Sequence, residues 1–159
     1  MSRLESMRRR LTAQIDGINW ATNQIKAVDG DVLELGLGNG RSFDHLRQEI
    51  KGRRIWVIDR ILECHPSCIP PAVDFLCGEA EDMLGNMASN HTRIALAHYD
   101  FGFGVKDLDV QEGVKLSPSI ASVMVPGGLV LSQQPLVGFN QISGPDTIDP
   151  ERYFFYRSI

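Results

Sequence analysis

The sequence of 159 residues has few cysteines, no long hydrophobic run and no excess of positive charge. Three cysteines, an odd number, do not make the disulfide framework of a small secreted protein, so we expect a reducing, cytoplasmic environment. No apolar run approaches the roughly 20 residues that cross a bilayer, and no apolar segment follows the basic N-terminus as it does in a signal peptide. A formal net charge of −4 argues against nucleic acid as a partner, because phosphate binding needs a basic surface.

Two common catalytic signatures are also absent. There is neither a Gly-x-Ser-x-Gly elbow nor a Gly-Lys-Ser/Thr phosphate loop, which excludes the common hydrolase and nucleoside triphosphatase classes. What the sequence does have is the composition of an ordinary soluble globule, with 43% hydrophobic and 23% charged residues. Its length fits a single domain over residues 1–159.

Short apolar runs alternate with segments of helical spacing along residues 31–132. The runs predict strands that are buried on both faces, and they span Asp31–Gly36, Arg54–Asp59, Ala72–Cys77, Arg93–His98 and Gly128–Ser132. The alternation predicts an α/β fold: a Rossmann-like, doubly wound and mostly parallel sheet with helices on both faces.

The two terminal segments differ from this core. Residues 1–28 predict a helix, because apolar residues from Leu4 onward fall close to one face. Its Arg8-Arg9-Arg10 cluster either lies on a solvent-exposed face of the helix or binds an acidic partner. Residues 133–159 predict a loop and then one strand, Tyr153–Tyr156. We expect this aromatic strand to stay exposed and to pair with another subunit in a homodimer or larger homo-oligomer.

Acidic residues and glycines gather at the carboxyl ends of four predicted strands, where doubly wound sheets bind ligands. In chain order these ends carry Leu33-Glu34-Leu35-Gly36 with the loop Leu37-Gly38-Asn39-Gly40, then Asp59, then Gly78-Glu79-Ala80-Glu81, and then His98-Tyr99-Asp100. Carboxylates at four consecutive strand ends indicate a binding cleft.

The glycine loop departs from the dinucleotide-binding fingerprint in two respects. Arg41 stands where that fingerprint has its third glycine, and Glu34 is an ionisable group inside an otherwise apolar strand. A buried carboxylate is costly unless a cation or a donor meets it. It repels a pyrophosphate but accepts a ligand with an ammonium group. The alternative is a Glu34 that pairs with Arg41 or Arg60.

Asp59, at the end of the second predicted strand, has two interpretations. A carboxylate at this place can accept hydrogen bonds from both hydroxyls of a ribose, or it can cap a helix. The glycine loop upstream favours the ribose interpretation.

The segment from Val32 to Ser42, which reads VLELGLGNGRS, resembles the first motif of class I S-adenosylmethionine-dependent methyltransferases. Asp59 resembles their ribose-binding acid, and Gly78–Glu81 resembles their turn beside the adenine. The resemblance implies that Glu34 and the glycine loop face the methionine end of S-adenosylmethionine. It also implies that Asp59 holds the ribose and that Glu79 and Ala80 line the adenine pocket. The predicted cofactor-binding set is completed by Arg60, Gly78 and His98.

The end of the chain departs from this family. Family members usually finish with a strand, a helix and a two-strand hairpin, whereas only a short segment follows Ser132. We therefore expect one conventional strand to be absent. The fourth strand also lacks the Asn/Asp-Pro-Pro-aromatic run of enzymes that methylate amino groups of nucleic acid bases.

The predicted reaction is an in-line attack by an acceptor atom on the sulfonium methyl group. His98 and Asp100 are the candidate bases. The alternative for His98 is a histidine at a strand end whose ring nitrogens are hydrogen-bonded within the protein. Tyr99, Phe101 and Phe103 suit the walls of a small-molecule site. A faint similarity of His98-x-Asp100 to metal-dependent O-methyltransferases does not lead us to expect a metal.

Cys64-His65-x-x-Cys68 gives no zinc prediction either, because it is a single ligand cluster. Two other functions remain open. One is a protein that binds S-adenosylmethionine but has lost catalysis, and the short C-terminal segment is the feature that supports it. The other is an NAD-dependent oxidoreductase, which Arg41 disfavours.

Overall fold

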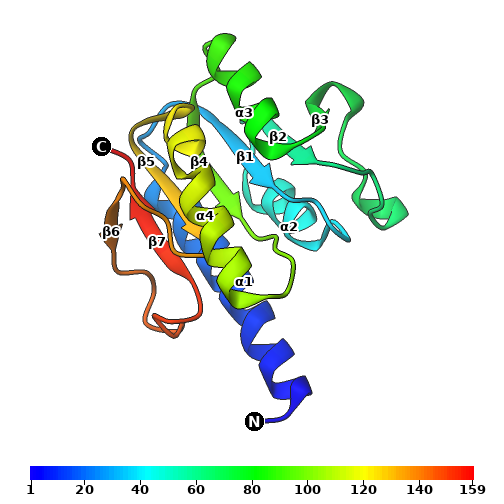
Figure 1. The fold of residues 1–159 in the computed structure, drawn as a ribbon, viewed down its shortest axis with the longest axis vertical. Coiled ribbons are helices and arrows are strands. Elements are labelled where there is room, and N and C mark those ends of the chain that lie inside the picture. The colour runs from blue at the N-terminus through cyan, green and yellow to red at the C-terminus, as the bar shows by residue number, and fades with distance from the viewer.

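Five strands form at the continuous apolar runs of the sequence, and together with two C-terminal strands they join in one seven-stranded sheet. The computed structural model describes residues 1–159. The strands are β1 (Asp31–Leu35), β2 (Ile55–Asp59), β3 (Phe75–Cys77), β4 (Ile94–Tyr99), β5 (Met124–Ser132), β6 (Asn140–Ile142) and β7 (Phe154–Arg157). Their order is β3-β2-β1-β4-β5-β7-β6 (Figure 1). The first five strands run parallel, and β7 is antiparallel to both β5 and β6.

Four α-helices cover the two faces of this sheet, as predicted. They are α1 (Arg3–Gln24), α2 (Arg41–Glu49), α3 (Ala80–Ser89) and α4 (Lys106–Ala121), and two short 3₁₀ turns span Pro66–Cys68 and Ala72–Asp74. Apolar residues of α1 and α2 pack in one core, and those of α3 and α4 pack in a second core on the other face. The strands feed both cores because successive side chains point to opposite faces: Val32 joins the first core and Leu33 the second.

The C-terminal segment corrects one prediction. It forms two strands, β6 and β7, so the sheet has its full seven strands although we expected one to be missing. No helix lies between β5 and β6. The helix that the resemblance implies between these two strands is therefore not formed. The turn into β6 is made by residues 133–139.

The aromatic strand corrects a second prediction. β7 lies inside the sheet between β5 and β6, and Tyr153, Phe155 and Tyr156 are at most 5% exposed. It is therefore not an open edge, and the reason for expecting a subunit to pair with it is lost. None of the helices is long and apolar enough to cross a membrane.

Strand order reverses at β1, which pairs with β2 on one side and with β4 on the other. In sheets of this type the ligand crevice opens at the carboxyl ends of the strands beside that reversal. The glycine loop leaves β1 at this point, and the segment after β4 leaves beside it (Figure 1).

Candidate functional site

The glycine loop between β1 and α2 depends on backbone conformations that favour glycine. Gly36, Gly38 and Gly40 have φ values of 90°, 51° and 88°. A Cβ atom on Gly36 would lie 2.8 Å from the Cβ of Phe101, and one on Gly40 would lie 2.5 Å from the Cβ of Cys68. The loop therefore needs glycine both for its turns and for the close approach of its neighbours.

Asp59 anchors this loop from the end of β2. Its Oδ2 accepts hydrogen bonds from the backbone N–H groups of Leu37 (2.7 Å) and Gly38 (3.2 Å). Its Oδ1 accepts a weaker bond from the N–H of Ile61 at 3.3 Å. Asp59 is thus the cap of a loop and not of a helix. A carboxylate has about four lone-pair sites, so acceptor capacity remains for a ligand.

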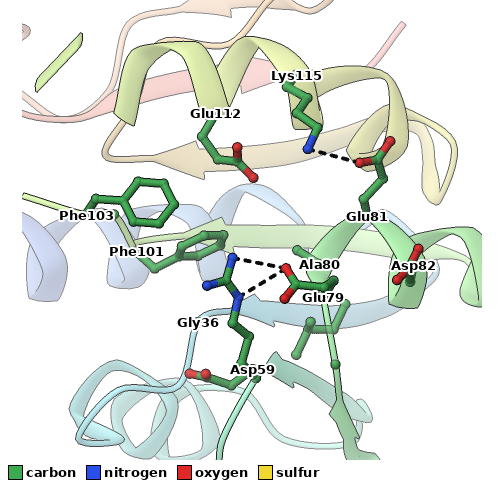
Figure 2. A pocket seen from close by; sticks show the side chains of 14 residues that line it. Gly36, Asp59, Glu79, Ala80, Glu81, Asp82, Phe101, Phe103, Glu112 and Lys115 are labelled. Atoms are coloured by element: carbon green, nitrogen blue, oxygen red, sulfur yellow. Dashed lines mark hydrogen bonds and ion pairs between the residues drawn. The ribbon is translucent and has the colours of Figure 1, made fainter. Parts of the chain in front are cut away.

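A cavity with a volume of about 340 Å³ opens at these strand ends (Figure 2). It collects predicted cofactor residues from three separate parts of the chain. Its lining consists of Gly36, Ile58, Asp59, Arg60, Gly78, Glu79, Ala80, Glu81, Asp82, Phe101, Gly102, Phe103, Glu112 and Lys115. Figure 2 shows Phe101 and Phe103 on one side of this space and Glu79 and Ala80 on the other.

Two ion pairs link the walls of the cavity. Arg60, next to Asp59, contacts Glu79 at 3.0 Å, and Lys115 of α4 contacts Glu81 of α3 at 3.3 Å (Figure 2). The partners in both pairs are about half exposed or more, so each pair adds little to stability. Their effect is to join β2 to the turn before α3, and α3 to α4, around the same space.

Four members of the predicted glycine loop do not border this cavity. Leu37 is buried in the first core, whereas Gly38 and Asn39 are exposed at the tip of the loop. Gly40 begins α2 beneath Cys68. Of the loop, only Gly36 reaches the cavity wall.

Glu34 and His98 lie beneath the loop, fully enclosed. Glu34 Oε1 and His98 Nδ1 form a hydrogen bond of 2.7 Å, and both side chains are 0% exposed. Burial raises the pKa of Glu34. Burial alone would lower the pKa of His98, but the Glu34 carboxylate raises it above its ordinary value. The partner of the buried acid is therefore His98, and neither Arg41 nor Arg60 meets it. Glu34 Oε2 has no hydrogen-bond partner in the protein.

Asp100 continues this enclosed network toward α1. Its carboxylate accepts hydrogen bonds from Tyr153 Oη (2.7 Å), Arg10 Nη2 (3.1 Å) and Gln14 Nε2. Tyr153 Oη also lies 3.5 Å from His98 Nε2. Burial alone would raise the pKa of Asp100, but His98, the Tyr153 hydroxyl and Arg10 hold it below its ordinary value.

This geometry bears on the predicted bases and substrate walls. Neither His98 nor Asp100 lines the cavity, and both are occupied by protein partners. Tyr99 is 1% exposed and packs in the second core, edge-on against Phe101 with ring centroids 4.8 Å apart. It is therefore a core residue and not a substrate wall. Phe101 and Phe103 do reach the cavity.

Sequence reasoning missed the contribution of the helices to the cavity wall. Asp82 lies in the first turn of α3, and Glu112 and Lys115 lie on α4. Asp82 follows the predicted turn Gly78–Glu81 directly, so continuing that motif would have found it. Nothing in the pattern of α4 marks Glu112 or Lys115, because their position depends on how α4 packs on the sheet.

Comparison with known proteins gives three results. The family model described as S-adenosyl-L-methionine methyltransferase matches residues 1–158. No curated protein matches the chain. A solved S-adenosyl-L-methionine methyl transferase from Silicibacter pomeroyi is 31% identical, with a TM-score of 0.94, and the match covers 100% of this chain and 99% of that one.

More distant solved structures share the fold alone. Human Methyltransferase-like protein 13, in complex with SAH, is 10% identical, with a TM-score of 0.53 and coverage of 98% of this chain and 81% of that one. A SAM-dependent methyltransferase from Agrobacterium tumefaciens is 14% identical, with a TM-score of 0.51 and coverage of 91% and 61%. The chain belongs to the S-adenosyl-L-methionine methyltransferase family.

Proposed function

We propose that the cavity beside Gly36 holds the adenosyl part of S-adenosylmethionine and that the chain transfers the methyl group to a small-molecule acceptor. One observation carries this proposal: a single cavity brings together Gly36, Asp59 and the Glu79-Ala80 turn, which are far apart in the sequence. The resemblance to the family assigns these same residues to the cofactor.

The lining fits the cofactor in chemistry as well as in position. Asp59 faces the cavity with acceptor capacity for ribose hydroxyls, and Ala80 leaves room beside the turn for a flat ring. The lining has five carboxylates and two basic side chains, and this excess of negative charge favours a sulfonium cation over a pyrophosphate. The charge balance thus supports S-adenosylmethionine against NAD.

Phe101 and Phe103 support a small, partly apolar acceptor. Phe101 forms a wall of the cavity beside Gly36, and Phe103 is 56% exposed at its mouth. Gly102 and Gly104 flank Phe103, and the N–H of Phe103 donates to Asp109 Oδ1 at 2.5 Å, so α4 holds this segment at the mouth of the cavity. An acidic cavity of this size gives no groove for a polyanionic strand.

The chain acts mainly by orientation and by exclusion of water. S-adenosylmethionine supplies a methyl group that is already activated, which an acceptor atom takes as the carbon–sulfur bond breaks. The residues of this chain would fix the donor against Asp59 and hold the acceptor against the phenylalanines. His98 and Asp100 support this geometry from below, through the network that joins β1, β4 and α1.

Thermal unfolding with added ligands tests the cofactor part of the proposal. S-adenosylhomocysteine at a hundredfold excess over its Kd should stabilise the chain by about 2.7 kcal/mol. NADH should leave the melting temperature unchanged. Stabilisation by NADH alone would contradict the assignment of the cavity.

Transfer of a labelled methyl group tests the acceptor part. The chain is incubated with labelled S-adenosylmethionine and a fractionated cell extract. We expect label in the small-molecule fraction and none in nucleic acid. Cofactor binding without transfer to any fraction would favour a protein that binds S-adenosylmethionine and has lost catalysis.

A further inference from the structure

A second cavity, separate from the cofactor cavity, lies between the N-terminal half of α1 and the segment before β7. Its volume is about 290 Å³. It is lined by Arg8, Arg9, Thr12, Ala13, Thr147, Ile148, Asp149 and Arg152, and it shares no residue with the first cavity. Here it is called the arginine cavity. Figure 1 shows that this half of α1 projects beyond the sheet.

The arginine cavity concentrates positive charge in a chain whose net charge is −4. Three of its side chains are guanidinium groups, and only Asp149 is acidic. Asp149 is already paired with Arg9 at 2.8 Å. Arg8 and Arg152 are in no ion pair, so their charges remain uncompensated.

The donors in this cavity suit an oxyanion. All basic residues of α1 are arginines, whose planar fork of N–H groups matches a carboxylate or a phosphate better than lysine does. Arg152 Nη2 donates to the backbone oxygen of Ser6 at 2.9 Å, but its Nε is buried and has no partner. The buried Nε is closed to a ligand, so an oxyanion would bind Arg152 through its Nη groups.

Two residues that are next in sequence to lining residues of the arginine cavity contact the end of β4. Arg10, next to Arg9, donates to Asp100, and Tyr153, next to Arg152, does the same. Asp100 directly follows β4 and precedes Phe101 of the cofactor cavity. Asp100 therefore links α1 and the residue that precedes β7 to the segment where the acceptor is proposed to bind.

We infer that the arginine cavity binds a carboxylate or phosphate group, and that this group belongs to the methyl acceptor. The acceptor is then an anionic small molecule, held at its charged end by Arg8 and Arg152. Its assignment to the acceptor rests on the proposed function, whereas the oxyanion site stands on the cavity alone.

Titration of the full chain with inorganic phosphate at constant ionic strength tests the site. We expect saturable binding at one site, and we expect Arg8→Gln and Arg152→Gln each to weaken it at least tenfold. Arg3→Gln is the matched control, because Arg3 is an exposed arginine of the same helix outside the cavity. Arg8 is also exposed, so its replacement should leave the fold intact. Absence of saturable binding, or unchanged binding by Arg8→Gln, would overturn the site.

Labelled methyl transfer to extract fractions tests the assignment to the acceptor. The labelled product should be retained by an anion exchanger, and its formation should be at least tenfold slower with Arg8→Gln at low acceptor concentration. A product that is not retained would overturn the assignment. The S-adenosylhomocysteine shift of Arg8→Gln should equal that of the unaltered chain. A missing shift in the unaltered chain would instead contradict the proposed function and leave the phosphate result standing.

Discussion

Asp59 shows how one side chain can serve both the fold and the ligand. Its carboxylate holds two N–H groups of the glycine loop and faces the cavity at the same time. A ligand that binds there therefore meets a loop that is already ordered. The conformational entropy of the loop is lost when the chain folds, so it is not lost again when the ligand binds.

Replacing Asp59 with alanine should affect both properties. We expect the affinity for S-adenosylhomocysteine to fall roughly 10- to 150-fold, because hydrogen bonds to a charged group are worth about 1.5–3 kcal/mol. We also expect the free energy of unfolding to fall by about 1–3 kcal/mol, since the N–H groups of Leu37 and Gly38 lose their acceptor. Calorimetric titration and urea unfolding measure the two effects. Asp29→Ala, an exposed acid outside the cavity, is the control. Unchanged affinity in a folded variant would leave Asp59 as a loop anchor only.

Asp100 should make stability depend on acid pH. Its pKa is held below the ordinary value of 3.8 in the folded chain. The ionised carboxylate therefore stabilises the fold above about pH 3.8, and this contribution disappears as the pH falls through the lower folded-state pKa. Asp100→Asn should cost about 1.5–3 kcal/mol at pH 7, and the difference from the unaltered chain should shrink in strong acid. Urea unfolding between pH 7 and acid measures it. A constant difference at all pH values would contradict this role.

The partner of Glu34 marks the limit of sequence reasoning at the residue scale. The sequence indicates that a carboxylate within an apolar strand needs a partner, and Arg41 and Arg60 were the candidates. The structure pairs it with His98, 64 positions away. That choice is made by the register of β1 on β4, which sets Glu34 directly beside His98. Register between parallel strands depends on the whole sheet and leaves no local signal.

At the scale of elements, the helix α2 depends on the residue that begins it. Gly40 is its N-cap, in a left-handed conformation, and the Cβ atoms of Cys68 and Cys64 close over it. The segment after β2 is fixed in the same place by a hydrogen bond from the N–H of His65 to the backbone oxygen of Asn39, 3.0 Å long. The Cys64-His65-x-x-Cys68 sequence thus packs on the glycine loop.

Gly40→Ala should lower the free energy of unfolding more than the same substitution at another glycine with a left-handed backbone conformation. Gly52 has a similar φ of 77° but open space around its Cα, so Gly52→Ala should cost only the conformational strain of about 1–2 kcal/mol. Gly40→Ala adds a contact of 2.5 Å with Cys68, for which overpacking costs about 1–3 kcal/mol more. Urea unfolding of the two variants measures the difference. Equal losses would show that the Cys68 segment moves aside freely.

Elements were predictable where burial leaves a pattern and unpredictable where it does not. The five parallel strands are apolar runs with few polar interruptions, and all five were expected. β6 has the sequence Asn-Gln-Ile and is mostly exposed, so no alternation or apolar run identifies it as a strand. It exists because β7 offers it a partner. The third strand was expected from Ala72 but begins at Phe75, after a short 3₁₀ turn.

At the scale of the whole molecule, assembly depends on the edges of the sheet. The two edge strands are β3 and β6, each three residues long. Short edges offer few unpaired backbone groups to another chain, which is a common protection against pairing. The aromatic residues that suggested a subunit contact lie inside, at β7. The homo-oligomer was expected because an aromatic strand would be exposed at an edge. The observed edges are short instead, and this favours a monomer.

We expect light scattering at tens of micromolar, on the order of a weak homodimer's Kd, to give the mass of one chain, 17.7 kDa. The faces of the sheet cannot supply an interface in its place, because α1 and α2 cover one face and α3 and α4 the other. A dimer mass would contradict this expectation. In that case Gln141→Pro, which removes a backbone donor from β6, would decide between the two edges. Loss of the dimer would assign the contact to β6, and its persistence would assign it to β3 or to the helices.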